Sequence, residues 1–144
     1  MTSLKRSLFV PFSVNEMYCL VNDVEQYPKF LPWCSAAKVL VSDSTHMEAM
    51  LSISKGRFKH DFSTSNTLQD NEYIMINLLN GPFKEFSGGW RFTTVDSGSL
   101  VELELEFEFD GLILGAALSL ASGVVVDTLV DAFKKRAYKI YEGR

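Results

Sequence analysis

The sequence predicts an α+β domain in which a curved antiparallel sheet of about seven strands wraps around one long C-terminal helix, with two short helices after the first strand. Alternating apolar and polar residues recur in segment after segment between residues 36 and 110, which is the pattern of strands with one buried face. Short turns join these segments, so neighbouring strands should be antiparallel. Only the stretch 112–141 is long enough to cover the buried face of such a sheet. At 144 residues the chain forms a single domain, residues 1–144, with a substantial core.

The N-terminal part predicts one strand and two short helices. The strand covers residues 4–10 and stops at Pro11. Ser13 and Glu16 then have the spacing of a capping box, so a helix should begin after Ser13 and end near residues 22–23. In the next stretch, 24–34, two prolines limit any helix to a turn or two. Its large apolar side chains either pack down as a second short helix or form a lip over a cavity. These side chains are Tyr27, Phe30, Leu31 and Trp33.

The central part predicts strands joined by turns. Gly88–Gly89 inside one of them predicts a bulge or a bend. In the last strand five carboxylates alternate with five apolar residues, so the carboxylate face must lie in water. Carboxylates in one row of one strand diverge rather than converge on a point, which argues against acid–base or metal chemistry there. The predicted strands cover residues 36–41, 47–53, 57–64, 73–79, 86–95 and 101–110.

The C-terminal helix is predicted over residues 112–141 and has two unlike halves. No charge occurs between Asp110 and Asp127, whereas the remainder is amphipathic, with apolar residues at steps of three and four. The uncharged run is shorter than the ~20 apolar residues of a membrane-spanning helix, and Gly115 and Gly123 interrupt it. We therefore expect a helix that lies across the sheet and whose first half is buried or covers something apolar.

Charge and cysteine content favour a cytoplasmic protein that does not bind DNA. The net charge of −4 argues against broad electrostatic binding to nucleic acid or to anionic membranes. The C-terminus is locally basic, which is typical of a solvated helix end stabilised by the helix dipole. Cys19 and Cys34 have neither metal spacing nor a CxxC pattern and fit reduced intracellular thiols. The N-terminus has no apolar core of a signal peptide.

The sequence argues against most enzyme classes. His46 is placed at a turn and should be exposed, whereas His60 alternates with Phe58 and Phe62 and can point inward. A lone inward histidine is more often a hydrogen-bonded core residue than a base or a ligand. No metal-ligand spacing, GxSxG elbow, Walker loop or GxGxxG is present. We expect no catalytic residue, no metal and no cofactor. A cyclase-like enzyme that uses His60, Tyr73 or an inward acid as its base is the weakest alternative.

Four stretches together resemble one known family. The segment 21–34 reads VNDVEQYPKFLPWC and looks like an N-terminal family signature, and 80–92 reads NGPFKEFSGGWRF and looks like the central one. Residues 105–110 and 132–137 match the last strand and the helix end. The chain resembles the START-like (SRPBCC) superfamily of polyketide cyclases and lipid transport proteins. Within it the RatA-type ribosome association toxins, relatives of the mitochondrial coenzyme Q-binding protein, are most similar. The resemblance covers essentially the whole chain. It implies the helix-grip fold and two functions, ubiquinone binding and interference with ribosomal subunit association.

The leading hypothesis is a non-catalytic carrier of an apolar ligand, ubiquinone or a related isoprenoid quinone, that supports respiration. The uncharged helix half, the aromatic stretch before Cys34 and the many inward phenylalanines favour it. At ~0.8 kcal/mol per buried CH₂, a few isoprene units can outweigh the ordering costs of binding. Transient membrane contact would suit such a carrier. Any single residue of this set is more often core than ligand contact. The predicted entrance comprises Tyr27, Phe30, Leu31 and Trp33, and the predicted wall comprises Phe58, His60, Phe62, Trp90, Phe92, Leu114 and Leu118.

The alternative hypothesis is a ribosome association toxin that binds the large ribosomal subunit, blocks subunit joining and has an antitoxin protein as a further partner. The net negative charge counts against it, because phosphate contacts supply most of such affinity. A small basic patch can nevertheless dock at one place. The two hypotheses are compatible, since one uses the interior and the other the surface. The candidate contacts are Lys55, Arg57, Lys59, Lys134, Lys135 and Lys139.

Overall fold

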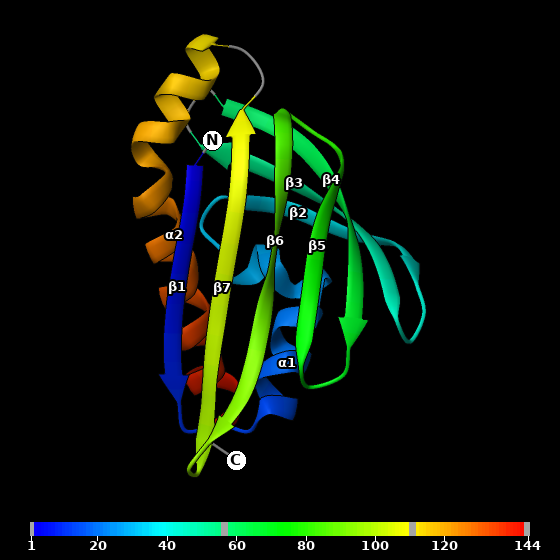
Figure 1. Cartoon of the computed structure of the whole chain (residues 1–144), viewed down its shortest axis with the longest axis vertical. Helices are drawn as coiled ribbons and strands as arrows, with labels where there is room; N and C mark the ends of the chain where they lie inside the picture. The colour runs from blue at the N-terminus through cyan, green and yellow to red at the C-terminus, as the bar shows by residue number, and fades with distance from the viewer. Residues whose placement is uncertain (1, 56–57, 110–111, 143–144) are drawn as a thin grey trace.

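The computed structural model describes residues 2–55, 58–109 and 112–142, with side chains for residues 2–54, 59–109 and 123–142. A seven-stranded antiparallel sheet, two short helices and one long helix make up the fold (Figure 1). This confirms the predicted sheet wrapped around a C-terminal helix. The elements are β1 (Thr2–Val10), α1 (Val14–Asn22), the 3-10 helix η1 (Val24–Lys29), β2 (Cys34–Ser42), β3 (His46–Lys55), β4 (Phe58–Gln69), β5 (Tyr73–Asn80), β6 (Phe83–Val95), β7 (Gly98–Phe109) and α2 (Leu112–Tyr141).

The strand order is β1-β7-β6-β5-β4-β3-β2. Strands β2 to β7 therefore form a run of hairpins, and β1 joins as the edge strand beside β7, with Thr2 opposite Phe107 and Val10 opposite Ser99. The sheet curls strongly, and α2 lies along β1 and β7 while α1 lies against β6 and β7 (Figure 1). Arg6 of β1 forms an ion pair with Asp127 of α2, so the long helix is also tied to one edge of the sheet.

The capping box at the start of α1 is present as predicted. The backbone N–H of Glu16 donates to Ser13 Oγ at 3.1 Å, and the backbone N–H of Ser13 donates to Glu16 Oε1 at 3.0 Å. Two otherwise unpaired backbone donors are thereby satisfied where the helix begins. The following segment forms η1, which the hydroxyl of Tyr27 joins to α1 by donating to the carbonyl of Val21.

The glycine pair in β6 does not form a bulge. Its pairing with β7 runs without interruption from Glu85 to Val95, and the register shift lies between Phe83 and Glu85 instead. A Cβ on Gly88 would collide with the carbonyl oxygen of Glu104, so glycine is needed where the two strands approach closely. The predicted bulge at Gly88–Gly89 is therefore wrong in position, and the pair marks a place where β6 and β7 approach closely.

The last strand has the wet face that the sequence predicts. Glu104, Glu106 and Glu108 are exposed, while Leu103 and Phe107 on the opposite face are buried. Asp110, the fifth carboxylate, lies outside the described residues. The carboxylates thus line the outer surface of the sheet, which leaves the inner surface for the helices.

Phe133 of α2 is the centre of the core. Its side chain is 2% exposed, and its ring centroid lies 5.3 Å from that of Tyr27, 5.2 Å from Phe30 and 5.1 Å from Trp90. Edge-to-face aromatic contacts of this kind stabilise beyond the area they bury. One side chain thus joins α2, η1 and β6. Within residues 2–55, 58–109 and 112–142, no helix is both long and apolar enough to cross a membrane.

We expect Phe133→Ala to lower the free energy of unfolding by about 3–5 kcal/mol, because it removes a fully buried ring and leaves a cavity. Urea unfolding followed by circular dichroism measures the loss. The matched control is Phe9→Ala, which removes a ring that is 52% exposed on β1 and should cost about 1 kcal/mol or less. Similar losses in the two variants would show that Phe133 is not the centre of the core.

Candidate functional site

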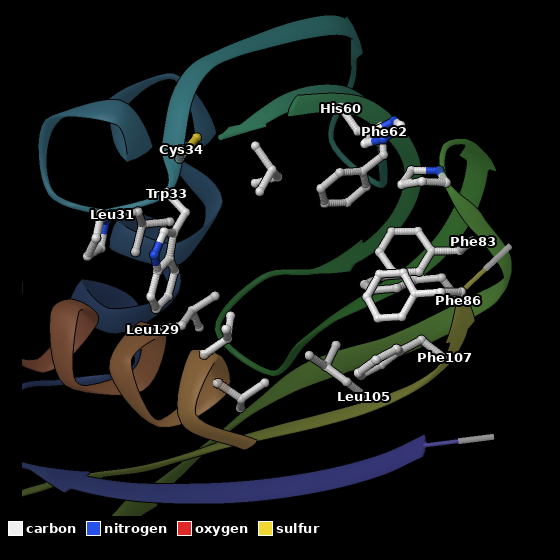
Figure 2. A pocket seen from close by; sticks show the side chains of 16 residues that line it. Leu31, Trp33, Cys34, His60, Phe62, Phe83, Phe86, Leu105, Phe107 and Leu129 are labelled. Atoms are coloured by element: carbon white, nitrogen blue, oxygen red, sulfur yellow. The ribbon is translucent and has the colours of Figure 1, made fainter. Parts of the chain in front are cut away.

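An apolar cavity of about 210 Å³ lies between α2 and the inner face of the sheet. In Figure 2, Leu31, Trp33 and Leu129 lie on one side of it, and Phe62, Phe83 and Phe86 lie across from them. No Asp, Glu, Lys or Arg is among its described lining residues. The lining comprises Leu31, Pro32, Trp33, Cys34, Ile53, His60, Phe62, Pro82, Phe83, Phe86, Leu105, Phe107, Phe109, Val125, Val126 and Leu129.

The segment between η1 and β2 forms one wall of the cavity. The backbone N–H of Leu31 donates to the carbonyl of Tyr27 at 2.9 Å, and that of Cys34 donates to the carbonyl of Leu31 at 3.2 Å. The carbonyl of Trp33 accepts from the N–H of Ser54 in β3 at 2.8 Å. These bonds hold the segment against the sheet. The sequence predicts that the stretch 24–34 forms either a second short helix or a lip over a cavity. Both are present, since residues 24–29 form the helix η1 and residues 31–34 form the lip.

A cluster of phenylalanines forms the opposite wall. The ring centroid of Phe83 lies 5.6 Å from Phe62, 4.9 Å from Phe86 and 4.8 Å from Phe109. Phe83 and Phe86 are three residues apart and would point to opposite faces of a regular strand. The bulge between Phe83 and Glu85 adds one residue, so both rings face the cavity, opposite Phe109 and Phe107.

The lining changes in exposure from its inner part to its opening. Leu31, Cys34, Phe107 and Val126 are buried, whereas Pro32 and His60 are exposed and mark the opening. The Cys34 thiol donates to the carbonyl of Ala36 at 3.3 Å. Burial raises the pKa of this thiol, against a smaller lowering by the Ala36 backbone. The cysteine is therefore neutral near pH 7, and the inner part of the cavity carries no charge among the described side chains.

The structure brings four of the predicted ligand-binding residues to this cavity. Leu31, Trp33, His60 and Phe62 line it. His60 shares the cavity-facing side of β4 with Phe62, as their alternation predicts, but it is exposed and lies at the opening. Their role in binding stays a prediction, as does that of Phe58, Leu114 and Leu118, whose side chains lie outside the described residues.

Four other predicted residues belong to the packed core beside the cavity. Tyr27, Phe30 and Trp90 surround Phe133, and Phe92 packs edge-on against Tyr18. They are absent from the described lining. Alternation along β6 correctly predicts that Trp90 and Phe92 point inward, but their distance along the strand places them nearer the α1 end. Pro82, Phe83 and Phe86 line the cavity in their place, and the sequence analysis missed them.

The remaining predicted residues lie on the surface or at its edge. His46 is half-buried rather than exposed, because its Nε2 lies 2.8 Å from Ser65 Oγ. Lys134 and Lys139 are exposed near the end of α2, and Lys135 forms an ion pair with Asp131 at 3.0 Å. Lys59 is exposed near the start of β4, and in Figure 1 the start of this strand lies at the other end of the molecule from the end of α2. The basic residues predicted on β4 and those predicted on α2 therefore do not form one patch. The side chains of Lys55 and Arg57 lie outside the described residues.

Among the described residues, no three histidines, cysteines or carboxylates lie close enough together to hold a metal ion. The structure thus offers an apolar cavity as its candidate site. A space of this kind can bind a hydrocarbon or a flat ring, and its walls come from the lip, the phenylalanine cluster and α2.

The sequence is similar to one family model and to several named proteins. The family model described as polyketide cyclase / dehydrase and lipid transport matches residues 10–134. The ribosome association toxin RatA of Escherichia coli (strain K12) is 37% identical over 145 residues, which cover 100% of this chain and 92% of the relative. RatA of Vibrio cholerae is 41% identical over 142 residues, with 98% and 99% covered. A mitochondrial coenzyme Q-binding protein of Dictyostelium discoideum is 23% identical over 135 residues, with 90% and 66% covered.

Solved structures show the same fold. An aromatase/cyclase from a Streptomyces species superposes with a TM-score of 0.86 at 14% identity, covering 96% of this chain and 94% of the other. A START superfamily protein from Mycobacterium smegmatis has a TM-score of 0.83 at 17% identity, with 96% and 98% covered. Both therefore agree with the helix-grip architecture predicted from the sequence.

We expect the stability of the protein to fall above about pH 10. Burial raises the pKa of Tyr27 far above its ordinary value, with Cys34 and Asp23 adding to the shift, and burial together with Asp70 raises the pKa of Tyr18 to about 12. A folded-state pKa above that of the unfolded chain stabilises fully below the unfolded pKa and loses this stabilisation as pH rises. Urea unfolding at a series of pH values measures the decline.

The matched variant is Tyr27→Phe. It lowers stability near pH 7 by roughly 1 kcal/mol, because the bond to Val21 is lost. Above about pH 10 its stability should fall less steeply than that of the wild type, by up to about 1.4 kcal/mol per pH unit. Parallel pH profiles would contradict a role for the Tyr27 proton.

Proposed function

The chain belongs to the polyketide cyclase / dehydrase and lipid transport family, and we propose that it is a non-catalytic binding protein for an apolar ligand, ubiquinone or a related isoprenoid quinone. The observation that carries this proposal is the apolar cavity between α2 and the sheet, whose described lining includes six Phe or Trp side chains and no Asp, Glu, Lys or Arg. The mitochondrial coenzyme Q-binding relative supports the choice of a quinone. We place the activity in the cytoplasm and infer a carrier role that supports respiration.

The size of the cavity supports a ligand rather than a plain core. An apolar space of about 210 Å³ that opens to solvent leaves apolar side chains in contact with water, which is unfavourable at about 25 cal/mol per Å². An apolar occupant would remove that contact. Since an apolar cavity of about 150 Å³ holds benzene, this one fits a single ring or about one to two isoprene units.

The lining supports binding without catalysis. General acid–base catalysis needs a titratable group aimed at the reacting atoms. Of the lining residues, Cys34 is bonded to the Ala36 carbonyl and His60 sits at the opening. Tyr73, the other named candidate base, is absent from the described lining. Within that lining, a cyclase-like reaction would therefore depend on His60.

The test is organic extraction of the protein purified gently from its native host, followed by mass spectrometry. We expect a near-stoichiometric quinone from the wild type and at least a tenfold smaller amount from Leu129→Trp. This variant fills the cavity from α2 without adding charge, and a larger ring there removes the space that the ligand needs.

The control is Leu79→Trp, the same substitution at a residue that is 44% exposed on β5. It should retain the wild-type amount of quinone. Calorimetric titration of the emptied proteins with a quinone then compares their affinities directly. A wild type that yields no quinone and takes up none would refute the proposed function.

A second candidate function is binding to the large ribosomal subunit so that subunit joining is blocked, with an antitoxin protein as partner. The identity of 37–41% to proteins named ribosome association toxins favours it. Lys134 and Lys139 are exposed on α2 and could contact phosphates of ribosomal RNA. The net charge of −4 confines such contacts to a small surface, because phosphate binding depends on local positive charge.

We expect the double variant Lys134→Glu/Lys139→Glu to co-sediment with purified large subunits at least tenfold more weakly at moderate salt, because repulsion replaces phosphate contacts. Lys5→Glu/Lys84→Glu changes the net charge equally at two exposed lysines away from the end of α2 and should bind like the wild type. Equal weakening in the two variants would indicate a net-charge effect and not a contact at α2.

A further inference from the structure

We propose that the ligand occupies the cavity tail first, with its hydrocarbon end in the inner part and its polar headgroup at the opening beside His60. This inference rests on the proposed function and adds the orientation and the recognised part of the ligand. It is carried by the distribution of hydrogen-bonding groups over the lining, because volume alone does not distinguish a ring from a short isoprenoid segment.

The inner part of the lining lacks a group that could bind a quinone carbonyl. Its buried side chains are Leu31, Cys34, Phe107 and Val126, and the only heteroatom among them is the Cys34 sulfur. This thiol donates to the carbonyl of Ala36. The backbone N–H groups of Leu31 and Cys34 donate to Tyr27 and Leu31, so they too are occupied.

The backbone groups of the two other inner residues, Phe107 and Val126, also have hydrogen-bond partners within the sheet and the helix. Phe107 is paired on both sides within the sheet, with Phe86 of β6 and Thr2 of β1. Val126 lies within α2, where backbone groups bond along the helix. A carbonyl oxygen that reaches these four buried residues would therefore lose its bonds to water and find no donor among them.

The opening of the cavity, unlike the inner part, is in contact with water. His60 and Pro32 are exposed there. A headgroup at this place stays in contact with water, so its oxygens lose few hydrogen bonds on binding.

The carbonyls of a para-quinone sit on opposite edges of its ring. A head-first ligand would bury at least one of them without a donor, which weakens binding by roughly tenfold to a hundredfold. The tail contains no polar atom and meets no such penalty. The recognised class is therefore an amphiphile with a terpenoid or alkyl tail, and its headgroup should be exchangeable at small cost.

The first experiment compares two probes by calorimetric titration of the delipidated protein. One is a dimethoxy-methyl-benzoquinone with a decyl tail, and the other is the same quinone with a hydroxyl at the end of that tail. Tail-first binding buries the hydroxyl, so the second probe should bind at least tenfold more weakly. Equal affinities would overturn the orientation while leaving the proposed function intact, and no binding of either probe would overturn both.

The second experiment places a hydroxyl in the inner part of the cavity with Val126→Thr. The two side chains are nearly equal in size, and a threonine hydroxyl can bond a carbonyl of the preceding helical turn, so the fold should be retained. We expect the decyl quinone to bind several-fold more weakly and the preference for it over the hydroxylated probe to shrink at least threefold.

Head-first binding predicts the opposite sign, because the new hydroxyl would then donate to the buried carbonyl and tighten the binding of the decyl quinone. The matched control is Val130→Thr, one turn further along α2. Val130 packs against the core and is absent from the described lining. This variant should leave both affinities and their ratio unchanged, and an equal effect there would overturn the assignment of Val126 to the ligand's end.

Discussion

The attachment of α2 to the sheet through Phe133 is the contact on which the rest of the structure depends. The ring meets Tyr27 and Phe30 from the η1 side and Trp90 from β6. Because interiors are packed as closely as crystals, this contact fixes how near the helix lies to the sheet. About two turns earlier in α2, near Val126, the helix does not fill the space between itself and the phenylalanine cluster, and the cavity lies there.

The interior contains two aromatic clusters, one around Phe133 and one around Phe83, and they differ in how closely they are packed. The one around Phe133 is closed, with rings from different elements in mutual contact. The one around Phe83 is half-buried and faces an open space. Its rings hold one another in place through contacts within the sheet, so they need no ligand to be ordered. A wall that is formed in advance spares a ligand the cost of ordering side chains when it binds.

The elements of the fold could be predicted from local patterns, whereas the site could be predicted only in part. Ser13 and Glu16 indicate the helix start because a capping box is a local device, and alternation in β7 indicates its wet face. Trp90 and Phe92 were correctly predicted as inward, but period-two alternation says nothing about which part of the interior they reach. Phe83 was missed because a bulge shifts the alternation by one residue, and the position of that bulge depends on pairing with β7.

The arrangement of α2 also keeps the sites of the two proposed functions apart within one small domain. Val126 and Leu129 face the cavity, while Lys134 and Lys139 lie in the solvent further along the same helix. Phe30 connects the two regions. Its neighbour Leu31 lines the cavity, and the guanidinium of Arg136 lies 5.3 Å from its ring centroid. A ligand in contact with Leu31 would therefore lie one residue from a ring that meets the basic end of the helix. These contacts couple the cavity to the exposed lysines of α2 only if the lip can adopt two conformations. A comparison of the ligand-bound and the ligand-free protein would reveal whether the lip does so.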